Sequence, residues 1–131
     1  MFLKSLKKGI GLGKKFIEVG SGTSQLSIAL AYGTNNTVVA FDGTRESIAL
    51  GEKFARENEL ENCSFVLGDL FDDPFEEAYF DYVWCSGVLH HTKSPKSGFK
   101  LISRWLRKDF AMFIKNSKFC DCREQNFDFL M

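Results

Sequence analysis

Short apolar runs alternate with segments of helical periodicity along most of the chain. The apolar runs are residues 15–19, 37–41, 63–67, 79–85 and 110–114. After the first run, small and apolar residues recur at the spacing of one helix face, namely Leu26, Ala29, Leu30 and Gly33, and Gly33 is a candidate stop for this helix. Continuous apolar runs of this length are typical of strands buried on both faces of a parallel sheet.

Two further segments have the pattern of amphipathic helices. One spans about Arg45 to Glu59, after a turn and helix cap at residues 42–44. The other opens at Pro95, a residue favoured in the first helical turn. The residues expected to face inward are Ile48, Gly51, Phe54 and Ala55 in the first helix, and Phe99, Ile102 and Leu106 in the second.

This order of elements predicts an α/β fold. Five strands separated by helices or loops form βαβ units, and right-handed crossovers place helices on both faces of the sheet. We therefore expect a three-layer, Rossmann-like, doubly wound and mainly parallel sheet of about five strands. The 131 residues suffice for one domain, over residues 1–131.

Composition and charge narrow the possible partners. Hydrophobic residues make up 44% of the chain and charged residues 26%, as in ordinary globular domains. The 17 basic and 17 acidic residues cancel, so the basic excess of nucleic-acid binders is absent and such a partner is not favoured. No apolar run approaches the roughly 18 residues of a membrane span. The lysine-rich segment 1–15 suits an amphipathic helix better than a targeting peptide.

The cysteine pattern favours a reducing, cytoplasmic compartment. Cys63 and Cys85 lie in apolar runs, where a free thiol behaves as a small hydrophobic group. Cys120 and Cys122 are close together, but no second ligand pair or nearby histidine accompanies them. We therefore expect no metal site.

The segment from Glu18 to Ser24, E-V-G-S-G-T-S, lies between the first strand and a helix. Glycines permit a sharp turn and close approach of a ligand, and the helix N-terminus offers free N–H groups and a partial positive charge. This arrangement predicts a nucleotide-type ligand. The third small residue of a dinucleotide fingerprint would fall on Gln25, which argues against NAD or FAD.

Two aspartates follow neighbouring strands. Asp42 ends the second strand, beside the glycine turn, where its carboxylate can accept bonds from ribose hydroxyls. Alternatively, it forms only an Asx turn or a helix cap. Asp69 ends the third strand at the same edge and either accepts a bond from a purine amine or begins an Asx turn. Spacing alone leaves both alternatives open.

The fourth strand leads into Cys85–Thr92 at this same edge, where open α/β folds bind ligands. His90 and His91 suggest metal or general-base chemistry. However, adjacent histidines point in different directions and the chain has no third one, so zinc is disfavoured. Either one histidine packs beneath the cofactor loop, or it acts on the substrate side.

Together these motifs resemble class I S-adenosylmethionine-dependent methyltransferases. Residues 18–24 resemble the first motif of the family, V-V-A-F-D at 38–42 its ribose-binding strand, and G-D at 68–69 its adenine-contacting segment. The stretch F-D-Y-V-W-C-S-G-V-L-H-H at 80–91 is similar to the small-molecule branch that includes ubiquinone/menaquinone-biosynthesis methyltransferases. The match extends over about residues 14 to 114.

The resemblance implies S-adenosyl-L-methionine as cofactor and a small molecule as methyl acceptor. It places Asp42 on the ribose and Asp69 on the adenine amine, while Glu18 orients the loop and favours the cationic sulfonium. The full set of implied cofactor contacts is Glu18, Gly20, Ser21, Gly22, Asp42, Gly43, Asp69, Leu70, Ser86 and Gly87. His90 and His91 are the candidate catalytic bases, needed only if the acceptor must lose a proton.

Two departures from the family pattern stand out. Ser24 occupies a position that is often a third glycine. The family usually has about seven strands, so we expect this chain to be truncated after the fifth. Residues 110–114 would then be a sheet edge that dimerises, is covered by residues 116–131, or leaves the fold marginally stable. The alternatives to an enzyme are a non-catalytic module that binds cofactor or packs against a partner, and a nucleotide-sugar or NAD-binding Rossmann domain.

Overall fold

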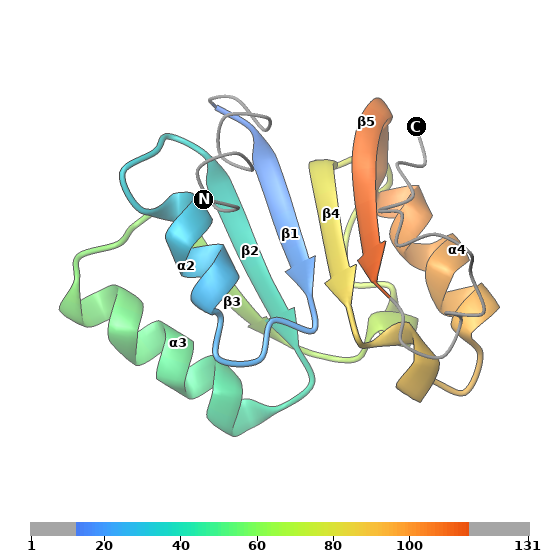
Figure 1. Ribbon diagram of the computed structural model, residues 1–131, viewed down its shortest axis with the longest axis horizontal. Coiled ribbons are helices and arrows are strands. Elements are labelled where there is room, and N and C mark those ends of the chain that lie inside the picture. Colours follow the sequence, from blue (N-terminus) through green and yellow to red (C-terminus); the bar gives the residue numbers. More distant parts are fainter. Residues whose placement is uncertain (1–12, 116–131) are drawn as a thin grey trace.

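The computed structural model describes residues 13–115, with side chains up to Lys108, and centres on one parallel sheet (Figure 1). The strands pair in the order β3-β2-β1-β4-β5, and every pair is parallel. Their bounds are β1 (Lys15–Val19), β2 (Thr37–Asp42), β3 (Cys63–Leu67), β4 (Phe80–Ser86) and β5 (Leu106–Lys115). The predicted parallel sheet of five strands is confirmed.

Helices cover both faces of the sheet, as predicted. The α-helices are α2 (Gln25–Ala31), α3 (Arg45–Glu57) and α4 (Pro95–Trp105), and short 3-10 turns occur at η1 (Leu70–Asp72) and η2 (Leu89–His91). Figure 1 shows α2 and α3 beside β1–β3, and α4 beside β5. Between β3 and β4 the chain forms one helical element, the 3-10 turn η1, and no α-helix.

Two apolar clusters form the core, one on each side of the sheet. Successive residues of a strand point to opposite faces, so Phe16 packs with Leu30 of α2, while Ile17 packs with Ile102 and Trp105 of α4. This division explains why the central strands are apolar at nearly every position.

The predicted inward face of α3 is wrong at Phe54, which is 48% exposed, whereas Ile48, Gly51 and Ala55 are buried. The helix lies so close to β3 that a Cβ on Gly51 would come within 2.5 Å of the Phe65 ring. This contact at Gly51 fixes the rotation of the helix and leaves Phe54 at its margin.

The predicted face of α2 is also partly wrong. The helix ends at Ala31, and the buried residues are Ser27, Leu30 and Ala31. Gly33 therefore does not belong to the helix face, but its left-handed φ of +68° just beyond the helix agrees with the predicted stop. A hydropathy pattern does not select a serine for a buried face. Ser27 is buried because its hydroxyl has a partner inside the domain, as described below.

Leu106 was predicted to lie on the last helix, but it begins β5. Helix α4 ends at Trp105, and Leu106 has the extended backbone of a strand, with φ −81° and ψ 132°. It pairs with Phe80 at the start of β4, next to an irregularity in the ladder. An apolar residue at such a junction satisfies either pattern, because both elements face the same core.

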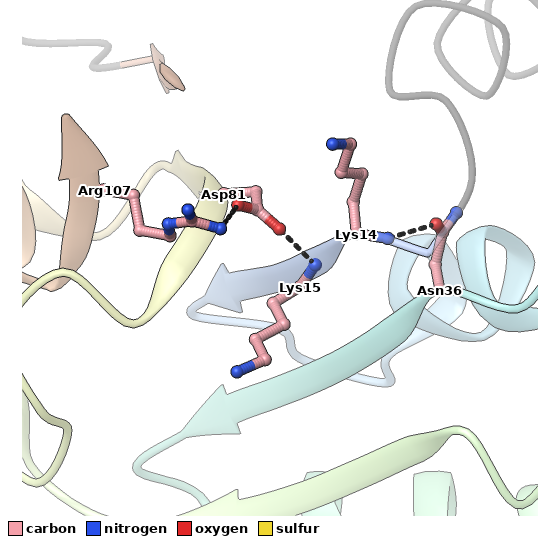
Figure 2. Close-up of polar contacts among 5 residues, drawn as sticks. All are labelled: Lys14, Lys15, Asn36, Asp81 and Arg107. Carbon is pink, nitrogen blue, oxygen red and sulfur yellow. Dashed lines mark hydrogen bonds and ion pairs between the residues drawn. The ribbon is translucent and has the colours of Figure 1, made fainter. Parts of the chain in front are cut away.

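Polar contacts connect the amino ends of the strands (Figure 2). The buried Asp81 accepts a bond from the backbone N–H of Lys15 at 2.8 Å and pairs with Arg107 at 2.9 Å, which links β4 to β1 and β5. The Asn36 side chain accepts from the N–H of Lys14 at 3.0 Å, immediately before β2. These contacts lie at the amino ends of the strands. The candidate site lies at the opposite edge of the sheet, where the strands have their carboxyl ends.

Within residues 13–115, no helix combines the length and the apolar character that crossing a membrane requires.

Candidate functional site

The carboxyl ends of β1 and β2 meet at the glycine loop (residues 20–24). The N–H groups of Gly20 and Ser21 donate to the Phe41 carbonyl at 2.8 and 3.0 Å. The N–H of Gly22 donates to Oδ2 of Asp42 at 2.8 Å. The structure therefore brings together the two groups on which the adenosyl-binding hypothesis depends.

The two glycines of this loop have different environments. Gly20 has a φ of +75°, and a Cβ there would lie 1.9 Å from Cγ2 of Val88. Gly22 has a φ of +54°, and a Cβ there would have nothing within 4 Å. Gly20 is thus a packing glycine, whereas Gly22 borders the open side of the loop. The sequence assigned both glycines the same role.

Glu18, at the end of β1, caps helix α2 from below the loop. Its buried carboxylate accepts bonds from the N–H and the hydroxyl of Ser27, at 3.0 and 2.5 Å. Burial raises the pKa of Glu18 to about 7; the bonds from Ser27 oppose this shift, and the charge of Asp42 adds to it. A titratable carboxyl therefore occupies the N-terminus of α2.

This arrangement does not suit a phosphate. In phosphate-binding loops the backbone N–H groups point at the ligand. Here Gly20, Ser21 and Gly22 direct theirs at β2, and the N–H of Ser27 is bonded to Glu18. In the first turn of α2, the expectation of free N–H groups is therefore wrong at Ser27. Two carboxyl groups flank the loop instead, which favours a cationic ligand over an anionic one.

Ser24 completes the loop in a conformation that usually requires glycine. It has φ 63° and ψ 23°, the left-handed region that L-residues rarely adopt. The residue is fully buried, and its hydroxyl donates to that of Ser21 at 3.3 Å. This explains why the position suits glycine and how a small serine replaces it.

Asp69 adopts the Asx turn that sequence reasoning considered. Its Oδ1 accepts from the N–H of Phe71 at 2.9 Å and begins η1. The side chain of Leu70 is buried in the core beside α4, so only its backbone could meet a ligand. Gly43 lies next to Gly68, since a Cβ on Gly43 would be 3.5 Å from the Gly68 carbonyl oxygen. The ends of β2 and β3 are therefore adjacent.

The end of β4 approaches the loop through Val88. Ser86 is the last residue of the strand, and Gly87 follows it with a φ of +70°. On η2, the rings of His90 and His91 lie 3.9 Å apart at 45°. Ser86 and Gly87 thus immediately precede Val88, the residue that contacts Gly20, and the histidines follow on η2.

Metal and thiol chemistry gain no support from the described residues. Within residues 13–115, no cluster of three or more His, Cys, Asp or Glu side chains could hold a metal ion. Burial raises the pKa of the Cys63 and Cys85 thiols to about 12. They are therefore inert core residues, as the sequence predicted. Cys120 and Cys122 lie outside the described residues.

Sequence reasoning missed three residues at this site: Val88, Ser24 as a structural element, and Ser27. The sequence did contain a signal for Ser27. This serine lies in the first turn of a helix, and the strand before that helix carries an acidic residue near its end. Nothing in the sequence identifies Val88, since its contact with Gly20 joins residues far apart in the chain.

Comparison with known proteins places the chain in a family. A family model described as "Methyltransferase domain" matches residues 10–128. A demethylmenaquinone methyltransferase of Staphylococcus aureus is 34% identical over 101 residues, which is 76% of this chain and 41% of the relative. The chain belongs to the class I S-adenosylmethionine-dependent methyltransferases. It spans less than half the length of this relative.

Solved structures share the fold of this methyltransferase domain. A methyltransferase from Aquifex aeolicus, whose description names SAM dependence, has a TM-score of 0.74 at 17% identity, covering 86% of this chain and 62% of its own. The [4+2]-cyclase SpnF has a TM-score of 0.78 at 21% identity, covering 86% and 43%. At these identities the likeness shows the fold alone, and a fold shared with a cyclase does not determine the reaction.

Proposed function

We propose that this domain binds S-adenosylmethionine and transfers its methyl group to a small-molecule acceptor. The hydrogen bond from the N–H of Gly22 to Asp42 carries the proposal. Because of this bond the Asp42 carboxylate, the proposed acceptor for the ribose hydroxyls, lies beside the open side of the loop. The flanking Glu18 supports a cationic ligand, and the name of the S. aureus relative supports a small acceptor.

The proposed cofactor pose follows the carboxyl edge of the sheet. Asp42 accepts from the ribose hydroxyls, with Gly43 beside it, and Asp69 accepts from the adenine amine. The methionine end lies over Ser21 and Gly22, towards Ser86 and Gly87. Glu18, beneath the loop, orients the loop and favours the cationic sulfonium. Gly20 shapes the turn through its contact with Val88. The backbone of Leu70 borders the adenine.

The chemistry asks little of the protein beyond alignment. The bound sulfonium supplies an electrophilic methyl group, and the residues around it orient that group and the acceptor for in-line displacement. Such positioning can supply about 7–11 kcal/mol of the barrier. Where the acceptor must lose a proton, His90 or His91 is the proposed base, since both lie near the end of β4.

A non-catalytic module is the second candidate. Its basis is that the same fold occurs in a protein named as a cyclase, so the fold by itself does not establish methyl transfer. Methyl transfer to a candidate acceptor distinguishes the two, and demethylmenaquinone, named for the relative, is the first acceptor to test. We place the domain in the cytoplasm, where its buried thiols would stay reduced.

Calorimetry should show that the chain binds S-adenosylhomocysteine and not NAD. Asp42→Ala should weaken this binding about tenfold or more, because a charge-assisted bond to ribose is lost. Binding of NAD in preference to S-adenosylhomocysteine would favour a dinucleotide domain. Unchanged affinity in Asp42→Ala would remove the ribose assignment.

The edge of β5 is the proposed site of homodimerisation. It is the last strand of the sheet in the described part of the chain, and exposed strand edges pair readily with other chains. Size exclusion at several concentrations should therefore show a dimer, with amides 110–114 protected from hydrogen exchange. A strictly monomeric chain in which those amides exchange rapidly would contradict dimerisation.

A further inference from the structure

We propose that Asp42 also acts as a positioning residue for the glycine loop, so that it supports binding at the methionine end of the cofactor as well as at the ribose. This inference rests on the proposed function and adds a role that acts through Gly22. In this role the carboxylate fixes the backbone of the loop before any contact with the ligand.

Three consecutive N–H groups of the loop point at the end of β2. Gly20 and Ser21 share the Phe41 carbonyl, while Gly22 uses Oδ2 of Asp42. The carbonyl is part of the backbone and persists in every variant. The Asp42 carboxylate is therefore the one acceptor among these that a substitution can remove.

Gly22 depends on this bond more than Gly20 depends on its own. Gly20 is confined by Val88 as well as by its hydrogen bond, whereas a Cβ on Gly22 would face open space. Packing thus does not fix the open side of Gly22. Its bond to an ionised acceptor is stronger than a neutral one and holds the left-handed turn in place.

The carboxylate can perform both roles at once. Oδ1 accepts from the N–H of Thr44 at 2.8 Å, in the turn that leads into α3, and Oδ2 accepts from Gly22 at 2.8 Å. Each carboxylate oxygen has a second acceptor position. Two ribose hydroxyls can donate to these positions without breaking either internal bond.

Asp42→Ala, tested with ligands that have and lack the ribose hydroxyls, separates the two roles. Alanine has no side-chain oxygen, so the N–H of Gly22 loses its acceptor, whereas an asparagine could turn its amide oxygen towards Gly22 and keep the bond. In the variant, hydrogen exchange of the Gly22 amide should be about tenfold faster or more. The Gly20 and Ser21 amides, bonded to the Phe41 carbonyl, should keep their protection and show that the fold is intact.

Calorimetry on the full chain then tests the effect on the ligand. The probes are S-adenosylhomocysteine and its 2′,3′-dideoxy analogue, which lacks the ribose hydroxyls. The positioning role predicts that Asp42→Ala weakens binding of the dideoxy analogue about tenfold, although this analogue has no ribose hydroxyl to donate to Asp42. Equal binding of this analogue to both proteins, or unchanged exchange at Gly22, overturns the inference. Failure of the wild-type chain to bind S-adenosylhomocysteine overturns the proposed function instead, and leaves the exchange result to decide whether the bond orders the loop.

Discussion

Gly20→Ala is expected to destabilise the domain by about 2–5 kcal/mol and to abolish measurable binding of S-adenosylhomocysteine. The added Cβ would lie 1.9 Å from Cγ2 of Val88, so the chain must shift at a point where β1 and the end of β4 meet. Overpacking of this kind costs about 1–3 kcal/mol. The left-handed backbone adds about 1–2 kcal/mol for a residue with a side chain. Urea denaturation and calorimetry measure the two effects.

Gly22→Ala is the matched control for this prediction. It imposes a similar backbone penalty, at a φ of +54°, but its Cβ enters open space. It should therefore cost only about 1–2 kcal/mol of stability, while still weakening binding if the ligand approaches that side. Adding Val88→Ala to Gly20→Ala removes the methyl group at 1.9 Å and should restore part of the stability. Equal destabilisation by the two alanine variants would show that the Val88 contact is unimportant.

The contrast between these glycines marks how far the sequence could be used. The turn, its place after β1 and its proximity to Asp42 followed from the pattern, because a parallel sheet aligns the carboxyl ends of its strands. The role of each glycine did not follow. It depends on which side chain from a distant loop occupies the space beside it, and Val88 has no distinguishing pattern.

The same reasoning explains the errors in the helices and strands. The two strands β1 and β2 were predictable because each is buried on both faces and is almost continuously apolar. Phe54 was misplaced because the close approach of Gly51 to Phe65 sets the rotation of α3. Ser27 was missed because a hydroxyl is buried only where a partner satisfies it, and that partner is a carboxylate nine residues earlier in the chain.

Glu18→Gln should make the domain more stable in alkaline solution than the wild type. The pKa of Glu18 is raised from 4.5 to about 7, so between these values the folded chain retains a proton that the unfolded chain has lost. Wild-type stability therefore falls as pH rises through this window, by about 3 kcal/mol in total. Glutamine has no proton to lose, and its amide oxygen can still accept from Ser27. The gain should be fully present above pH 7 and absent below pH 4.5.

Urea denaturation across this pH range tests the prediction as a difference between two curves. Glu46→Gln, which removes an exposed carboxyl from α3, controls for the loss of one acidic group. If the free energies of unfolding of the wild type and Glu18→Gln stay parallel from pH 4 to 8, then burial does not raise the pKa of Glu18 in the folded state.

The carboxyl of Glu18 lowers stability when it is ionised, so we expect its charge to contribute to ligand binding at the loop above it. An ionised Glu18 would favour a sulfonium over a neutral thioether, and its charge reaches the loop through a buried, low-dielectric region where Coulomb interactions are strong. The preference of the wild type for S-adenosylmethionine over S-adenosylhomocysteine should therefore increase as pH rises through about 7. In Glu18→Gln the preference should be smaller and should not change over this range. A pH-independent preference in the wild type would mean that Glu18 serves only to cap α2.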